Sequence, residues 1–191
     1  MQRPTSIWVF FGLIASGKSA VAEKWADRHG IAYFNSDRIR KELAGISATV
    51  EQKESYAQGI YSSELSRRTY AELLARAERE TGAGRSTVLD GSYQSRVERQ
   101  KVKALAGRLG VDLFFVLCNC PEDVTMERLA IRSRDPAAVS DGRPEIYWKQ
   151  KERFELPEEL GKDELVKLST VGPVADLLDK LDRFFEVDQH V

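Results

Sequence analysis

The sequence predicts a single α/β domain over residues 1–191, built around a parallel β-sheet with helices on both faces. Apolar runs of strand length alternate along the chain with longer patterns typical of helices. The first run, residues 7–11, breaks at a glycine and restarts as a helix, and the run 111–120 is apolar enough for an interior strand of a parallel sheet. A chain of 191 residues can bury one full core of this kind.

The break after the first apolar run carries the pattern G-x-x-x-x-G-K-S. Between a strand and a helix this pattern indicates a phosphate-binding P-loop, with a plain strand–turn–helix as the alternative. Glycines let successive N–H groups curl around an anion, and the helix N-terminus adds a favourable dipole. We expect Lys18 to reach the phosphates of a nucleoside triphosphate and Ser19 to hold Mg²⁺. The expected nucleotide contacts are Gly12, Ala15, Ser16, Gly17, Lys18, Ser19 and Ala20.

Charge and cysteine content indicate a small-molecule partner. The 29 basic and 30 acidic residues nearly cancel, and no polybasic run indicates binding to nucleic acid or to an anionic membrane. Cys118 and Cys120 are too few for a disulfide framework or a zinc site, which favours a reducing cytoplasm. The apolar N-terminal stretch contains the P-loop, and no other stretch approaches the length of a membrane span.

Apolar periodicity, caps and glycine stops predict the remaining elements. Strands are expected over 31–34, 86–90, 111–120 and 164–169, and helices over 17–28, 36–44, 62–80, 95–109, from 121, 145–154 and 174–185. The stretches 47–59 and 137–144 lack a clean period and are predicted to be mobile. Tyr70 is expected to pack, although its helix could also wall a substrate site.

A carboxylate, Asp37, follows the second predicted strand. In a doubly wound sheet this edge faces the ligand crevice, where Asp37 could orient or deprotonate an acceptor hydroxyl. The alternative is that Ser36 or Asp37 only caps the helix that follows. The nearby Arg38 and Arg40 could contact an anionic substrate or lie in solvent.

The third predicted strand ends at Asp90, followed by Gly-Ser-Tyr. Many P-loop proteins keep a carboxylate near magnesium at this point, so Asp90 is a candidate for both metal and substrate binding. Its alternative is to begin a turn before the glycine. Tyr93 is expected to face the substrate, and Arg99 is either a substrate contact or a solvated residue.

The helix from residue 121 carries Arg128 and Arg132 and breaks at the Asp-Pro pair 135–136. An arginine-bearing helix end before a Gly/Pro-flanked loop suits a closing lid, which would bring cations to the transferred phosphoryl group and exclude water. We therefore predict a lid over about 128–145, with an exposed charged hairpin as the alternative.

These motifs, in this order, resemble the small-molecule kinases of the AAA_33 or zeta-toxin/polynucleotide-kinase-like group of P-loop proteins. The likeness is strongest to the ATP-binding domain found fused to aminoglycoside-phosphotransferase-like domains. The resemblance implies an adenylate-kinase-like sheet of strand order 2-3-1-4-5, with ATP and Mg²⁺. It places Asp37 at the substrate hydroxyl and Arg132 in the lid over the phosphates. It also allows a phosphotransferase-like partner protein.

The resulting hypothesis is a cytoplasmic, ATP-dependent kinase that phosphorylates a hydroxyl of a small molecule. Its expected catalytic residues are Lys18, Asp37 and Arg132; further nucleotide contacts are Arg128 and Arg132; substrate contacts are Asp37, Arg40, Asp90, Tyr93 and Arg99; metal ligands are Ser19 and Asp90. One alternative is a nucleotide or polynucleotide-end kinase, which would want a clearer basic channel. Another is a P-loop ATPase or regulatory nucleotide-binding domain without a phosphoacceptor.

Overall fold

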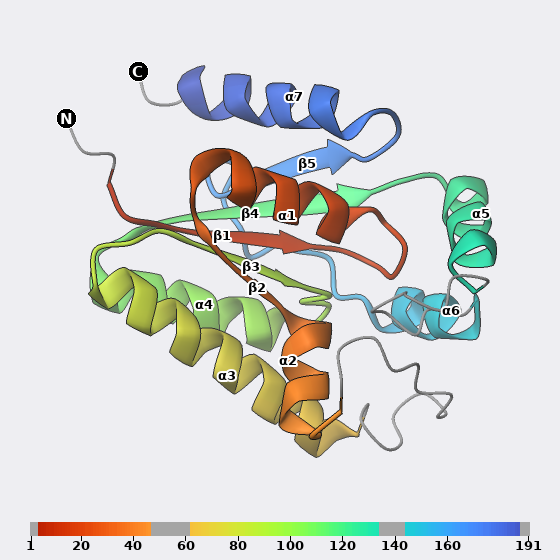
Figure 1. Cartoon of the computed structure of the whole chain (residues 1–191), viewed down its shortest axis with the longest axis horizontal. Helices are drawn as coiled ribbons and strands as arrows, with labels where there is room; N and C mark the ends of the chain where they lie inside the picture. Colours follow the sequence, from red (N-terminus) through yellow and green to blue (C-terminus); the bar gives the residue numbers. More distant parts are fainter. Residues whose placement is uncertain (1–3, 47–61, 134–143, 188–191) are drawn as a thin grey trace.

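A computed structural model describes residues 4–46, 62–133 and 144–187 of the chain (Figure 1). The strands are β1 Ser6–Phe11, β2 Ala32–Asn35, β3 Thr87–Gly91, β4 Asp112–Asn119 and β5 Leu165–Ser169. The helices are α1 Lys18–His29, α2 Ser36–Leu43, α3 Ser63–Gly82, α4 Arg96–Leu109, α5 Glu122–Arg132, α6 Pro144–Arg153 and α7 Val174–Val187. The predicted stretches 47–59 and 137–143 lie outside the described residues. Pro144, expected in a loop, instead begins α6, a position that proline favours.

The five strands form one parallel sheet of order β2-β3-β1-β4-β5, as the resemblance implied. Every residue of β1 is buried, because the strand lies in the middle of the sheet between β3 and β4. The chain leaves β1 toward β2 and β3 on one side and later reaches β4 and β5 on the other. In such sheets, ligands bind at the carboxyl end of the strand where the order reverses, which here is the end of β1.

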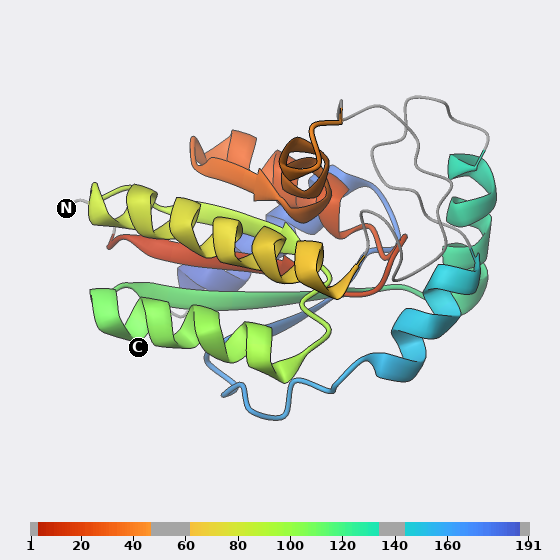
Figure 2. The same ribbon diagram turned by 90° about the horizontal axis from the view of Figure 1, so that it is seen from below.

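Helices cover both faces of the sheet, with α1 and α7 on one side and α3 and α4 on the other (Figures 1 and 2). Side chains alternate along β1: Trp8 and Phe10 pack toward α1 and α7, whereas Val9 and Phe11 pack toward α3 and α4. Because both faces are covered, the strands are apolar on both sides, which is why they read as continuous apolar runs.

A third, smaller apolar cluster lies at the carboxyl end of the sheet, where α5 and α6 stand (Figure 1). It joins Ile14 of the P-loop to Leu129 of α5 and to Ile146 and Tyr147 of α6. The N–H of Ile14 also donates a 2.9 Å hydrogen bond to Oε1 of Gln150. These contacts seat α6 directly against the phosphate-binding loop. Within the described ranges, every helix is too short or too polar to cross a bilayer.

Candidate active site

The P-loop has the backbone that its glycines predict. Gly12 and Gly17 have φ values of 143° and 84°, a range that residues other than glycine rarely adopt. A Cβ at Gly12 would lie 2.3 Å from the carbonyl oxygen of Cys118, and one at Gly17 would lie 2.9 Å from Oγ1 of Thr170. Both glycines are therefore required by the close approach of neighbouring backbone and side chains. Ala15, with φ 57°, adds a third positive-φ residue to the loop.

The polar groups of this loop are arranged for an anion. Nζ of Lys18 lies 3.4 Å from the carbonyl oxygen of Leu13, so the ammonium folds back over the loop that precedes it. Oγ of Ser16 is buried and has no hydrogen-bond partner in the described part of the protein. A buried hydroxyl without a partner is unfavourable, and a phosphate oxygen at the loop would relieve that cost. The residues present thus fit a nucleotide phosphate.

Arg128 closes the far side of the loop. Its guanidinium donates to the carbonyl oxygen of Thr170 at 2.7 Å, to Oγ1 of Thr170 at 3.2 Å and to the carbonyl oxygen of Ala15 at 3.4 Å. Thr170 follows β5, and its hydroxyl donates a 2.5 Å hydrogen bond to the carbonyl oxygen of Ser16. This arginine therefore links α5, the P-loop and the exit of β5, beside the expected nucleotide site.

The helix cap before α2 is Asn35, which excludes the alternative that Ser36 or Asp37 caps this helix. Oδ1 of Asn35 accepts hydrogen bonds of 3.0 Å from the backbone N–H groups of Asp37 and Arg38. Asn35 ends β2 in an extended conformation, as an N-cap requires. The Asp37 carboxylate is therefore not used for capping. It instead accepts a 2.5 Å hydrogen bond from the guanidinium of Arg40.

Asp37 and Lys18 line one cavity of about 450 Å³, which we call the acceptor cavity. Its lining comes from the P-loop, α2, α3, the exit of β3, α4 and α6. Tyr70 of α3 lies in this wall, and its hydroxyl is 2.9 Å from Oγ of Ser92. The described lining residues are Ile14, Lys18, Ser36, Asp37, Arg40, Ser63, Ser66, Arg67, Tyr70, Ser92, Gln94, Ser95, Glu98, Lys101, Ile146, Gln150 and Arg153.

Asp90 lies at the end of β3 with its side chain fully buried. Oδ2 accepts hydrogen bonds from the Tyr33 hydroxyl at 2.7 Å and from the Asn35 amide at 2.6 Å. Burial and the nearby Asp90 charge together raise the pKa of Tyr33, which keeps the phenol protonated as a donor. Oδ1 of Asp90 has no hydrogen-bond partner among the described residues. One carboxylate oxygen is thus held, and the other is free to accept.

Asp90 lies near the P-loop because it is the register partner of Phe10 in β1, the strand that leads into this loop. Burial raises the pKa of Cys118; the Asp90 carboxylate raises it further, and the Lys18 ammonium lowers it. Both charges lie at the carboxyl end of the parallel strands β1 and β3, which are neighbours in the sheet. Asp90 and Lys18 therefore flank the same end of the sheet.

The oxygen ligands available from Ser19 and Asp90 suit Mg²⁺ better than a metal ion that is coordinated entirely by protein side chains. In the ranges 4–46, 62–133 and 144–187, no three His, Cys, Asp or Glu side chains group together as a metal site. Mg²⁺ is commonly held through one or two protein oxygens, with phosphates and waters completing the octahedron. Ser19, in the first turn of α1, and the free oxygen of Asp90 would supply protein ligands of that kind.

Tyr93 does not face the cavity, which corrects the prediction that it binds substrate. It has a φ of 39°, is 1% exposed and packs edge-on against Tyr70 with ring centroids 4.9 Å apart. The turned backbone carries the side chain into the core beneath α3 and α4. Tyr70, expected mainly to pack, occupies the cavity wall in its place.

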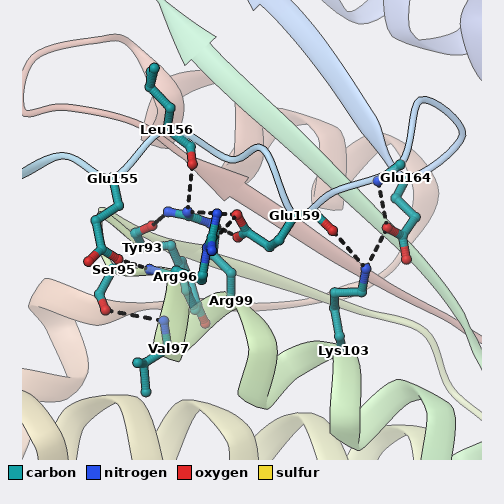
Figure 3. A network of polar contacts seen from close by, with 11 residues as sticks. Tyr93, Ser95, Arg96, Val97, Arg99, Lys103, Glu155, Leu156, Glu159 and Glu164 are labelled. Carbon is teal, nitrogen blue, oxygen red and sulfur yellow. Dashed lines mark hydrogen bonds and ion pairs between the residues drawn. The ribbon is translucent and has the colours of Figure 1, made fainter.

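Arg99 is likewise neither a substrate contact nor solvated, because it lies fully buried in a polar network (Figure 3). Its guanidinium donates to the carboxylate of Glu159 at 2.6 and 3.3 Å, to the carbonyl oxygen of Tyr93 at 2.8 Å and to that of Leu156 at 3.4 Å. Burial raises the pKa of Glu159, but the hydrogen bond from Arg99, a backbone hydrogen bond and the charges of Arg99 and Arg96 together outweigh burial, so the pKa of Glu159 is lowered.

This network joins two segments that flank the acceptor cavity. One is the exit of β3 with the first turn of α4; the other is the linker 154–164 between α6 and β5 (Figure 3). The carboxylate of Glu155 accepts from the backbone N–H of Arg96, and the N–H of Glu155 donates to the carbonyl oxygen of Gln94 at 2.9 Å. Arg99 therefore positions the end of α6 instead of touching a ligand.

The two remaining predicted residues lie outside the acceptor cavity. Ala20 is exposed on the first turn of α1, so a nucleotide contact would come from its backbone. Arg132 is the last residue of α5, half-buried, and does not line the described cavity. Its place over the phosphates stays a prediction, since residues 134–143 beyond it are outside the described part.

The sequence left open that α3 could form a wall of a substrate site, but it did not identify which residues of α3 and α6 reach the cavity. Polar residues on α3 recur at 63, 66, 67 and 70, and α6 contributes 146, 150 and 153. Spacings of three, four and seven residues place side chains on one face of a helix. This polar stripe on α3 was visible in the sequence, beside the apolar stripe that was used to predict the helix.

Comparison with known proteins agrees with this architecture. Residues 7–157 match the protein family AAA_33, described as an AAA domain. The uncharacterized protein Rv2004c of Mycobacterium tuberculosis is 27% identical over 135 residues, which cover 69% of this chain and 26% of the relative. An uncharacterized protein of Mycobacterium bovis, Mb2027c, matches to the same extent. The chain thus spans about a quarter of the length of these curated relatives.

Solved structures share the fold over nearly the whole chain. A gluconokinase from Sinorhizobium meliloti superposes with a TM-score of 0.63 at 23% identity, covering 100% of both chains. Shikimate kinase from Aquifex aeolicus gives 0.62 at 16%, covering 97% of this chain and 98% of that one. The APS kinase CysC of Mycobacterium tuberculosis, in complex with AMPPNP and APS, gives 0.61 at 17%, covering 97% and 99%. At these identities the likeness shows the P-loop kinase fold.

Proposed function

Because the chain belongs to the AAA_33 family of AAA domains, we propose that it is an ATP-dependent kinase that phosphorylates a hydroxyl of a small molecule. One observation carries this proposal: Lys18 of the P-loop and Asp37 of α2 line the same cavity. A lysine for the phosphates and a carboxylate for a hydroxyl, facing one space, are what in-line phosphoryl transfer requires. A nucleotide-binding domain without an acceptor would have no need for the carboxylate.

In the proposed reaction, ATP and an alcohol give ADP and a phosphate ester. When bound, ATP with Mg²⁺ supplies the transferred phosphoryl group. The bond from the γ-phosphorus to the β–γ bridging oxygen breaks, and a bond to the acceptor oxygen forms. Asp37 orients the acceptor hydroxyl and takes its proton, while Arg40 holds the Asp37 carboxylate in place. Lys18 balances the charge on the phosphates, and Ser19 and Asp90 hold the metal.

The names of the structural neighbours support this reading. A gluconokinase, a shikimate kinase and an APS kinase share the fold, and the last was solved with AMPPNP and APS. We further propose that Arg128 and Arg132 contact the nucleotide and that the region of about 128–145 acts as its lid. A phosphotransferase-like partner protein stays a prediction.

The test is ATP consumption with panels of sugars, nucleosides, nucleotides and polynucleotide ends, with water as the blank. One class of small alcohols should raise ADP release well above the blank, and the product should carry one phosphate. Release that never exceeds the blank, in a protein that binds ATP, would indicate a domain without an acceptor. A polynucleotide end as the best acceptor would favour the end-kinase alternative.

Asp37→Asn is the decisive variant in that assay. Transfer should fall on the order of 10²–10⁴-fold, the usual contribution of a positioned acid–base group. ATP affinity should stay close to wild type, and the protein should stay folded because Asn35 provides the helix cap. The melting temperature should fall, since the variant loses the ion pair between Asp37 and the almost buried Arg40. Asp27→Asn, which removes an exposed carboxylate on α1, is the matched control. Normal transfer by Asp37→Asn would overturn the assignment of Asp37.

A further inference from the structure

The acceptor cavity is strongly polar. Only two of its described lining residues, Ile14 and Ile146, are aliphatic, and Tyr70 is the one aromatic residue among them. Hydroxyl and amide side chains dominate the rest of the described lining: Ser36, Ser63, Ser66, Tyr70, Ser92, Gln94, Ser95 and Gln150. Such groups both donate and accept, which suits a ligand with several hydroxyls better than a flat apolar ring. The volume of about 450 Å³ suits a molecule of sugar size.

The described lining also carries an excess of positive charge. Five basic side chains line the cavity, against two acidic ones, although the chain as a whole has a net charge of −1. Lys18 belongs to the P-loop and Lys101 pairs with Glu98 at 2.8 Å. Three arginines remain, and they come from three separate helices: Arg40 of α2, Arg67 of α3 and Arg153 of α6.

These arginines differ in how readily they could leave their present partners to bind a ligand. Arg40 is almost buried and is tied to Asp37 at 2.5 Å, so it serves the carboxylate. Arg67 instead pairs with Glu64, one turn away, which does not line the cavity. The side chains of that pair are 71% and 62% exposed, so water screens it and a ligand could displace it at little cost.

We propose that the phosphoacceptor is a small polyhydroxylated anion, whose carboxylate or phosphate group is bound by Arg67 and Arg153 while one hydroxyl lies at Asp37. This inference rests on the proposed kinase function and adds the substrate class. A guanidinium matches a carboxylate or a phosphate in both charge and bidentate geometry.

A matched six-carbon series tests the proposal: sorbitol as the neutral member, gluconate as the carboxylate and glucose 6-phosphate as the phosphate ester. Binding is measured by calorimetry in the presence of AMPPNP, at one fixed salt concentration, and ATP consumption is measured in parallel. At least one anion should bind on the order of ten- to a hundredfold more tightly than sorbitol, since hydrogen bonds to charged groups contribute at that level. Comparing gluconate with glucose 6-phosphate shows which anion the cavity accepts.

The variants are Arg67→Gln and Arg153→Gln, with Arg68→Gln as the control. Arg68 is exposed on α3, next to Arg67, and does not line the cavity. Each of the first two should weaken binding of the preferred anion about tenfold or more and leave sorbitol binding unchanged, whereas Arg68→Gln should match wild type. Both substituted side chains are exposed, so the variants should fold.

Two results would overturn the inference. One is a series in which neither anion binds more tightly than sorbitol. The other is an anion preference that persists unchanged in both Arg67→Gln and Arg153→Gln. Failure of the kinase function gives a different pattern: an anion binds and depends on Arg67, but no ATP is consumed with it or with any other acceptor. Calorimetry therefore tests the proposed substrate class, and ATP consumption tests the proposed kinase function separately.

Discussion

The side-chain amide of Asn35 donates a 2.6 Å hydrogen bond to the buried carboxylate of Asp90. The other end of the same amide caps α2 by accepting from the N–H of Asp37. One residue at the end of β2 thus connects the candidate metal ligand to the candidate catalytic carboxylate. The ends of β2 and β3 lie side by side, because Asn35 and Asp90 are partners in the sheet register.

Asn35→Asp should test this connection through pH. Aspartate keeps the cap, but it replaces the donor to Asp90 with a second buried negative charge. We expect a loss of stability on the order of 3–5 kcal/mol at pH 8, which becomes smaller toward pH 5 as one of the two carboxylates takes up a proton. Urea unfolding at both pH values measures it. Asn35→Ala, which adds no charge, should show a deficit that hardly changes with pH.

Lys18→Ala should abolish tight ATP binding and leave the fold intact. The ammonium lies over the P-loop, and the residue has no part in the apolar clusters. Calorimetry with AMPPNP and a thermal melt measure the two effects. Lys24→Ala, on the exposed side of the same helix, should bind as wild type does. Unchanged affinity in the Lys18 variant would contradict the P-loop assignment.

Arg132→Ala should lower the rate of transfer far more than it lowers nucleotide affinity. A lid cation acts mainly on the charge that develops in the transition state, so kcat should fall on the order of 10²–10³-fold while the Kd for AMPPNP changes only slightly. Arg108→Ala, an exposed arginine on α4, controls for loss of surface charge. Equal losses in rate and affinity would instead indicate a phosphate contact in the ground state.

Arg99→Met should destabilise the protein by about 3–5 kcal/mol, because it leaves Glu159 charged and poorly compensated at a buried site. Arg96→Met is the matched control: Arg96 is half-exposed and lies 3.4 Å from the same carboxylate, so its loss should cost less than about 1 kcal/mol. Equal losses of stability in the two variants would show that the buried Arg99–Glu159 pair contributes no more than the exposed one.

The same pair gives a pH dependence of known sign. Arg99 lowers the pKa of Glu159 below its ordinary value of 4.5, so the pair contributes fully above that pH and loses its contribution as the pH falls through the lowered pKa. The difference in unfolding free energy between wild type and Arg99→Met should therefore be largest near neutral pH and shrink below pH 4.5. A difference that grows with acid would contradict this account.

Local patterns were enough for much of the fold. The glycines and lysine of the P-loop, the apolar run of β1 and the alternation of strands with helices are each written within a few neighbouring residues. The position of Asp37 just beyond β2 was also local information, since parallel strands bring their carboxyl ends to one edge. The sheet order came with the family resemblance and is confirmed by the structure.

Tertiary packing decided which side chains reach the acceptor cavity. Tyr93 points into the core because its backbone adopts a positive φ, and Tyr70 of α3 lines the wall of the acceptor cavity instead. Arg99 is buried in a pair with Glu159, which lies 60 residues away in the sequence. No local sequence pattern could indicate that the two residues are close in space. Asn35 caps α2 because its position at the end of β2 places the side-chain amide of Asn35 between Asp90 and the first turn of the helix. Sequence spacing shows which residues share a face of a helix, but the direction in which that face points depends on what the helix packs against.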